Sequence, residues 1–104
     1  MNTRAIGNAA ELEAKKMLQS QGFVAYKGIK TRFFPDDIFG LFDVIAINEK
    51  EVKLVQVKAG AIWPETRIAI ANFKVPANVS KEIWLRKKHQ PKDNFLLRWH
   101  VEIL

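Results

Sequence analysis

Three polar residues in two mostly apolar stretches near the middle of the chain could do chemistry together: Asp43, Gln56 and Lys58. The four residues Asn48–Glu51 separate the two stretches and predict an antiparallel hairpin in which Asp43 lies opposite Gln56. Because alternate residues of a strand share a face, Lys58 projects on the same side as Gln56, and the three side chains are expected to converge. An unpaired buried charge is costly, so we expect Asp43 and Lys58 to pair with each other, with a metal ion, or with both.

Hydrolysis of a phosphodiester bond requires groups of this kind: oxygen ligands for a hard cation such as Mg²⁺, and a positive charge near the attacking water. Asp43 would be the anionic ligand, Gln56 could offer its amide oxygen, and Lys58 could orient water and stabilise the charged transition state. Glu11, on a predicted helix, is the candidate for a further acid. Taken alone, Glu11 is more typical of a solvated helix carboxylate paired with Lys15.

The first half of the chain must place these residues. Apolar residues at three- and four-residue steps predict an amphipathic helix over residues 4–21. Aromatic and β-branched residues then predict a strand from Phe23 to about Gly28, followed by a polar, basic loop from Lys30 to Gly40. The two strands of the hairpin are expected at Phe42–Ile47 and Val52–Ala59, both buried on both faces.

The second half of the chain predicts one more helix and two more strands. Pro64–Phe73 is interpreted as a short helix despite its β-branched content, and Lys74–Ser80 as a connector. Strands are expected at Glu82–Lys87 and Phe95–Leu104, joined by the turn-like segment His89–Asn94. Residues 1–104 are therefore predicted to form a single domain, since a chain of this length rarely divides its core.

Charge and composition narrow the class of function. The chain has 17 Lys and Arg against 11 Asp and Glu, and the net charge of +6 favours a polyanionic partner, nucleic acid above all. The absence of cysteine excludes thiol catalysis and thiolate metal sites and is compatible with a cytoplasmic location. No segment approaches ~20 consecutive apolar residues, so we expect no membrane association.

Several basic and aromatic residues are candidates for contacts with nucleic acid. Lys27, Lys30 and Arg32 form a cluster that leads towards Asp43, and they could either contact phosphates or keep a strand edge charged. Trp63, shortly after Lys58, could flank a substrate channel, although a tryptophan more often belongs to a core.

The residues Gly7–Glu11, Phe39–Ala46 and Val55–Lys58, in this order, resemble the PD-(D/E)xK nuclease superfamily. Within it, they are most similar to the small archaeal Holliday-junction resolvase-type branch and to the phage and intron-encoded branches. The resemblance covers about the first 60 residues. It implies an α/β fold with a restriction endonuclease-like α-β-β-β-α-β core, in which helices flank a mixed central sheet. It also implies dependence on Mg²⁺, for which Mn²⁺ can substitute.

The resemblance further implies catalytic roles for Glu11, Asp43, Gln56 and Lys58, with the first three as metal ligands. Gln56 stands where the family has a second acid, which removes one negative charge from the metal site. The dipeptide Pro35-Asp36 also looks like the family's name motif, but Asp43 fits the hairpin and is assigned the metal. Asp37 is left as either a peripheral ligand or a loop residue.

We therefore expect a metal-dependent DNA endonuclease acting on duplex or branched DNA. Structure selectivity of the Holliday-junction resolvase kind is one alternative, and the sequence leaves open whether the substrate is a junction, a flap, a specific duplex site or RNA. One alternative is a catalytically inactive nuclease fold that only binds nucleic acid, and another is a protein whose basic surface binds another protein. A homodimer is predicted, because 104 residues offer little surface for holding a duplex.

Overall fold

A mixed sheet forms the centre of the protein, and its two faces carry one helix each. The computed structural model describes residues 3–28, 37–87 and 99–104. In chain order its elements are α1 (Thr3–Ser20), β1 (Val24–Lys27), β2 (Val44–Ile47), β3 (Val52–Ala59), α2 (Pro64–Asn72), β4 (Val79–Arg86) and β5 (Trp99–Ile103).

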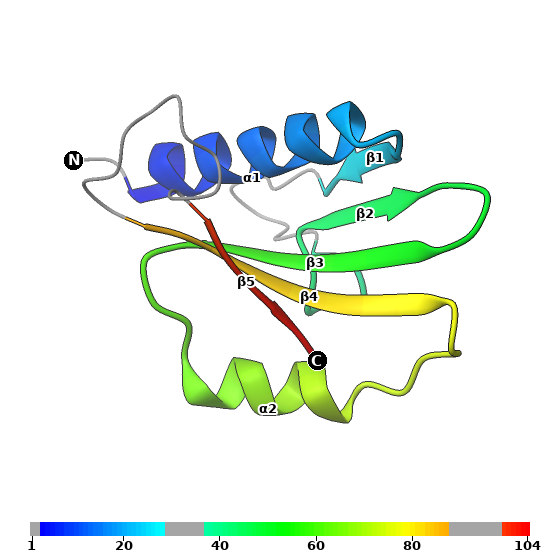
Figure 1. Cartoon of the computed structure of the whole chain (residues 1–104). Helices are drawn as coiled ribbons and strands as arrows, with labels where there is room; N and C mark the ends of the chain where they lie inside the picture. The colour runs from blue at the N-terminus through cyan, green and yellow to red at the C-terminus, as the bar shows by residue number, and fades with distance from the viewer. Residues whose placement is uncertain (1–2, 29–36, 88–98) are drawn as a thin grey trace.

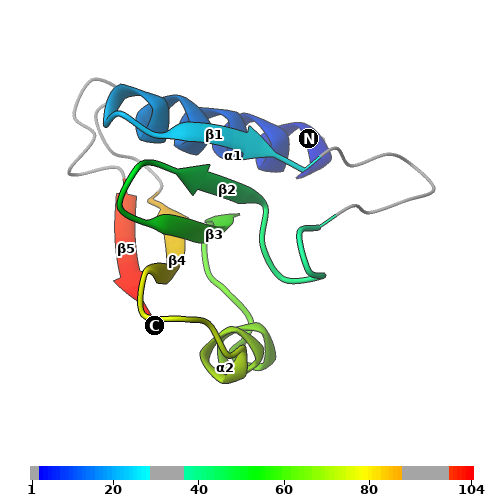
Figure 2. The same ribbon diagram turned by 90° about the vertical axis from the view of Figure 1, so that its right-hand side faces the viewer.

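The five described strands lie in the sheet in sequence order, β1-β2-β3-β4-β5. Only the β3–β4 pair is parallel, and α2 forms the crossover between these two strands; the other pairs are antiparallel. Figure 1 shows α1 on one side of the sheet and α2 on the other, and the rotated view in Figure 2 shows the same three layers. The structure is thus a compact single α/β domain, as predicted.

The predicted elements are found with small shifts at their ends. The helices expected at residues 4–21 and Pro64–Phe73 are α1 and α2, and the predicted hairpin is β2–β3. β4 begins at Val79, earlier than the expected Glu82, because Val79 and Ser80 already pair with β3. The turn predicted at His89–Asn94, the start of the last predicted strand and most of the predicted basic loop lie outside the described residues.

The face of the sheet under α1 holds the larger of two apolar cores. Small helix residues, Ala10 and Ala14, let α1 lie close to Val44 and Val55 on the sheet. Trp84 and Trp99 pack edge to face in the same core, with ring centroids 5.5 Å apart. Fully burying a large apolar side chain stabilises the folded protein by roughly 1.5–3 kcal/mol. The apolar contacts on this face therefore fix the position of α1 on the sheet.

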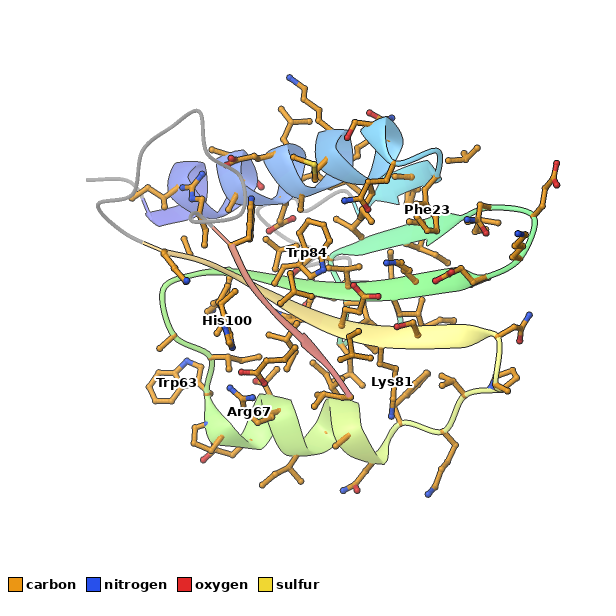
Figure 3. All side chains as sticks on the ribbon, viewed as in Figure 1. Phe23, Trp63, Arg67, Lys81, Trp84 and His100 are labelled. Carbon is orange, nitrogen blue, oxygen red and sulfur yellow. The ribbon has the colours of Figure 1, made fainter. Side chains whose placement is uncertain are left out.

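The face under α2 is more sparsely packed. Ile70 is the one buried residue of α2, and it lies in a cluster with Phe42, Leu54 and Ile83. Lys81, buried under the helix (Figure 3), donates hydrogen bonds of 2.8–2.9 Å to the carbonyl oxygens of Ile70, Ala71 and Phe73. A lysine therefore satisfies the last carbonyl groups of α2, where a cation is also favoured by the helix dipole.

Neither of the two described helices combines the length and the apolar composition needed to cross a membrane.

Candidate active site

The register of the β2–β3 hairpin agrees with the prediction. Ile47 pairs with Val52 across the Asn48–Glu51 turn, and the ladder continues to Val44 and Val55. It stops there, one residue short of the pair predicted between Asp43 and Gln56. Asp43 consequently lies at the point where β2 separates from β3.

The backbone and the side chain of Asp43 both form hydrogen bonds with β3 where the strand ladder ends. Its backbone N–H donates to the carbonyl oxygen of Val55 (2.8 Å), and its carboxylate Oδ2 accepts the N–H of Val57 (2.8 Å). Asp43 is 1% exposed, so this is a carboxylate held out of bulk water. Burying a carboxylate charge is costly unless hydrogen bonds or a cation compensate it.

Gln56 and Lys58 lie on one face of β3, as predicted. Val55 and Val57 belong to the core under α1, so the alternation of side chains places Gln56 and Lys58 on the face towards α2. Gln56 is half-buried and Lys58 is exposed. The Oδ2 atom of Asp43 is bonded to the backbone of the residue between them.

Glu11 approaches the same end of the sheet from the α1 side. It is 4% exposed, so it is not the solvated helix carboxylate that is typical of such a position. Its Oε1 atom lies 3.7 Å from Nζ of Lys27, the last residue of β1. Lys27 pairs across the sheet with Val44, the neighbour of Asp43, and the next residue, Gly28, donates its N–H to the carbonyl oxygen of Asp43 (2.9 Å).

The four predicted site residues therefore surround one end of the β2–β3 hairpin but do not share one face. Glu11 lies on the α1 face and Gln56 and Lys58 lie on the α2 face, while the Asp43 carboxylate is hydrogen-bonded to the backbone of Val57, the residue between Gln56 and Lys58. The reason is strand alternation, because packing Val57 against α1 turns both of its neighbours to the other side. The individual roles of these residues stay predictions.

The acidic pair fits a hard cation in its chemistry. Glu11 and Asp43 supply buried carboxylate oxygens, the ligands that Mg²⁺ prefers, and a bound cation would offset the cost of burying them. In the part of the chain that the structure describes, no group of three or more His, Cys, Asp or Glu side chains gathers where it could hold a metal. Among the described residues, the further ligands on offer are side-chain amides and backbone carbonyl groups.

A third buried acid, Glu82, was not singled out from the sequence. Its Oε1 accepts a hydrogen bond from Nε1 of Trp84 (3.0 Å), its Oε2 accepts one from Ser80 (2.9 Å), and Nζ of Lys53 lies 3.2 Å from Oε2. The alternating spacing of Ser80, Glu82 and Trp84 on one strand face is the signal that could have identified this cluster. Because both carboxylate oxygens have partners, we interpret it as a structural network.

The residues predicted to contact nucleic acid have different environments in the structure. Lys27 pairs with Glu11, Trp63 is exposed just before α2, and Lys30 and Arg32 lie outside the described residues. His100, labelled in Figure 3, is an exposed residue of β5, and its Nε2 atom lies 3.3 Å from Oε1 of Glu102.

No protein-family model matches this chain, and no curated protein sequence is significantly similar to it.

Proposed function

We propose that this protein is a Mg²⁺-dependent DNA endonuclease with a restriction endonuclease-like fold. The observation that supports it best is the pair of buried acids, Glu11 and Asp43, at the end of the hairpin strand that carries Lys58. The element order α1-β1-β2-β3-α2-β4 also agrees with the α-β-β-β-α-β core implied by the resemblance of the motifs around these residues. β5 is an addition to that core.

Each residue has a distinct part in the proposed reaction. Glu11 and Asp43 would hold the cation, which, when bound, stabilises the negative charge that develops on the phosphoryl oxygens. Lys58, exposed on the α2 face, would contact the scissile phosphate and orient the attacking water. Gln56 lies on the same face and would position that water or the phosphate through its amide. Lys27 balances the charge of Glu11 in the metal-free protein.

The direct test is cleavage of a panel of end-labelled DNAs, namely single strands, linear duplexes, flaps and four-way junctions, with Mg²⁺ or Mn²⁺. Lys58→Ala should reduce cleavage by about 100-fold or more while leaving folding and most DNA affinity unchanged. Lys50→Ala is the matched control, because Lys50 is an exposed lysine at the other end of the same hairpin. Cleavage of no DNA in the panel by the unmodified protein would refute the proposal.

A second candidate function is a catalytically inactive nuclease fold that binds nucleic acid. Two observations favour it: the hydrogen bond between the Asp43 carboxylate and Val57, and the lack of a third acid beside Glu11 and Asp43 among the described residues. Salt-sensitive DNA binding without metal-dependent cleavage would select this function.

The proposed nuclease would act as a homodimer joined through β1, an edge strand of the described sheet. Val24 and Tyr26 on β1, and Ile47 beside Val24 on β2, expose large apolar side chains on the face away from α1. Val24 and Ile47 also line a hollow of about 610 Å³. Exposed edges and apolar patches of this kind are typical of interfaces.

Light scattering should show a dimer, and Tyr26→Glu should convert it to a monomer. Ile103→Glu, on β5, is the control and should leave the dimer intact. A strictly monomeric unmodified protein would contradict the proposal.

A further inference from the structure

Trp63 differs from the other two tryptophans of the chain in its environment. Trp84 and Trp99 are 3% and 4% exposed in the core under α1, whereas Trp63 is 69% exposed. Figure 3 shows the ring of Trp63 standing clear of the sheet at the start of α2. Leaving most of an indole in water gives up one of the largest apolar burials that a side chain can provide.

The position of Trp63 in the helix does not explain its presence. Trp63 is the N-cap residue of α2, and its side chain makes no capping hydrogen bond. Ser, Thr, Asp and Asn are strongly preferred there because their side-chain oxygens accept a hydrogen bond from the helix backbone. Pro64, at the first helical position, sets the start of the helix without help from Trp63. Neither packing nor capping therefore accounts for an indole at this position.

The fold places Trp63 beside the lysine-bearing end of β3. Gly60 adopts a φ of 113°, a conformation that side chains rarely tolerate, and turns the chain out of the sheet shortly after Lys58. The N–H of Gly60 donates to the carbonyl oxygen of Arg86, the last residue of β4, so the exposed Lys87 that follows lies at the same end. An exposed aromatic ring and two exposed cations thus belong to segments that meet at the same end of the β3–β4 pair, on a chain of net charge +6.

We propose that Trp63 is a stacking platform for an unpaired nucleobase of DNA, with Lys87 contacting a neighbouring phosphate. Stacking of a base on an aromatic side chain contributes about 1–3 kcal/mol and is largely independent of sequence. Bases inside an intact duplex are already stacked on each other, so only single-stranded or branched DNA presents one to Trp63. This inference rests on the proposed function and names its substrate class as DNA with unpaired bases.

The test uses the unmodified full chain in EDTA, so that binding is measured without cleavage. Titration with a ten-residue oligothymidine should quench the tryptophan emission and protect it from iodide, because Trp63 is the one exposed tryptophan of the three. Trp63→Ala should weaken binding of the oligothymidine by about 5- to 150-fold, the equivalent of ~1–3 kcal/mol, whereas Trp63→Phe should retain most of the affinity.

Two comparisons make the test specific. Ile68→Ala removes another exposed apolar side chain of α2, 59% exposed, and should leave binding unchanged within about twofold. Binding of a blunt duplex should be equally unaffected by Trp63→Ala. Trp63→Ala that binds oligothymidine as well as the unmodified protein would overturn the inference, as would tighter binding of an oligouridine RNA than of the DNA.

The two proposals fail in different ways. If the protein cleaves DNA but Trp63→Ala binds oligothymidine normally, the stacking inference is wrong and the nuclease function stands. If oligothymidine binding depends on Trp63 but no DNA is cleaved with Mg²⁺ or Mn²⁺, the stacking inference holds for the inactive binding module.

Discussion

At both ends of the β2–β3 hairpin, a side-chain oxygen accepts backbone N–H groups, but the side chains differ. At the turn, Oδ1 of Asn48 accepts the backbone N–H groups of Lys50 (2.9 Å) and Glu51 (2.8 Å). At the open end, Oδ2 of Asp43 accepts the N–H of Val57 (2.8 Å). Each side-chain oxygen thus satisfies backbone donors where the ladder ends.

The difference is in charge and burial. Asn48 is neutral and half-buried, whereas Asp43 carries an ionisable carboxylate that is 1% exposed. The turn shows that a neutral amide is sufficient for the structural task. Under the proposed function, the buried carboxylate at the other end holds a cation together with Glu11.

Exchanging the carboxylate of Asp43 for an amide, and the amide of Asn48 for a carboxylate, should give the largest difference in cleavage rate. Asp43→Asn keeps an oxygen that can accept the Val57 N–H but removes the charge, so cleavage should fall by about 100- to 1000-fold. Asn48→Asp keeps the turn bonds, and cleavage should stay within about twofold of the unmodified rate. Single-turnover rates with Mg²⁺ provide the measurement. Normal cleavage by Asp43→Asn would mean that Asp43 is only a structural cap.

Metal binding should stabilise the open end of the hairpin and leave the turn end unaffected. At a Mg²⁺ concentration 100 times the dissociation constant, the free energy of unfolding should rise by about 2.7 kcal/mol, because the ion binds only the folded protein. Thermal unfolding with and without Mg²⁺ measures this increase. Glu11→Gln and Asp43→Asn should lose it, and Asn48→Asp should retain it. An equal increase in all four proteins would place the bound ion elsewhere.

Truncation of Asp43 or Asn48 to alanine should have the smallest effects, and the two losses in the free energy of unfolding should differ in size. Asp43→Ala leaves the buried N–H of Val57 without this acceptor and should lower the free energy of unfolding by about 1–3 kcal/mol. Asn48→Ala should cost about 0.5–1 kcal/mol, since water can replace a half-buried cap. Urea denaturation of metal-free protein would measure both values. Equal losses would show that burial does not distinguish the two ends.

Much of the fold could be predicted from local patterns. The three- and four-residue spacing of Ile6, Ala10, Ala14 and Met17 identified α1. The four-residue turn Asn48–Glu51 fixed the register of β2 and β3. These features depend on interactions between residues close in the chain, which the sequence displays directly. The start of β4 at Val79 was missed, because Val79 and Ser80 become a strand only by pairing with β3.

The candidate site could be predicted only in part. Strand alternation correctly placed Gln56 and Lys58 together, but it could not show that the ladder ends before Asp43 or that the Asp43 carboxylate bonds to the backbone of Val57. The burial of Glu11 and its contact with Lys27 could not be predicted from the sequence either, since both depend on how α1 lies across β1.

By itself, the sequence determined the helices, the hairpin register and the residue types that can hold a cation or contact a phosphate, because turn length and side-chain periodicity are local properties. Only the tertiary structure decided which face of the sheet each candidate occupies, and that Glu11 and Asp43 are shielded from water. Burial and facing depend on the packing of distant segments, here α1 on one face of the sheet and α2 on the other.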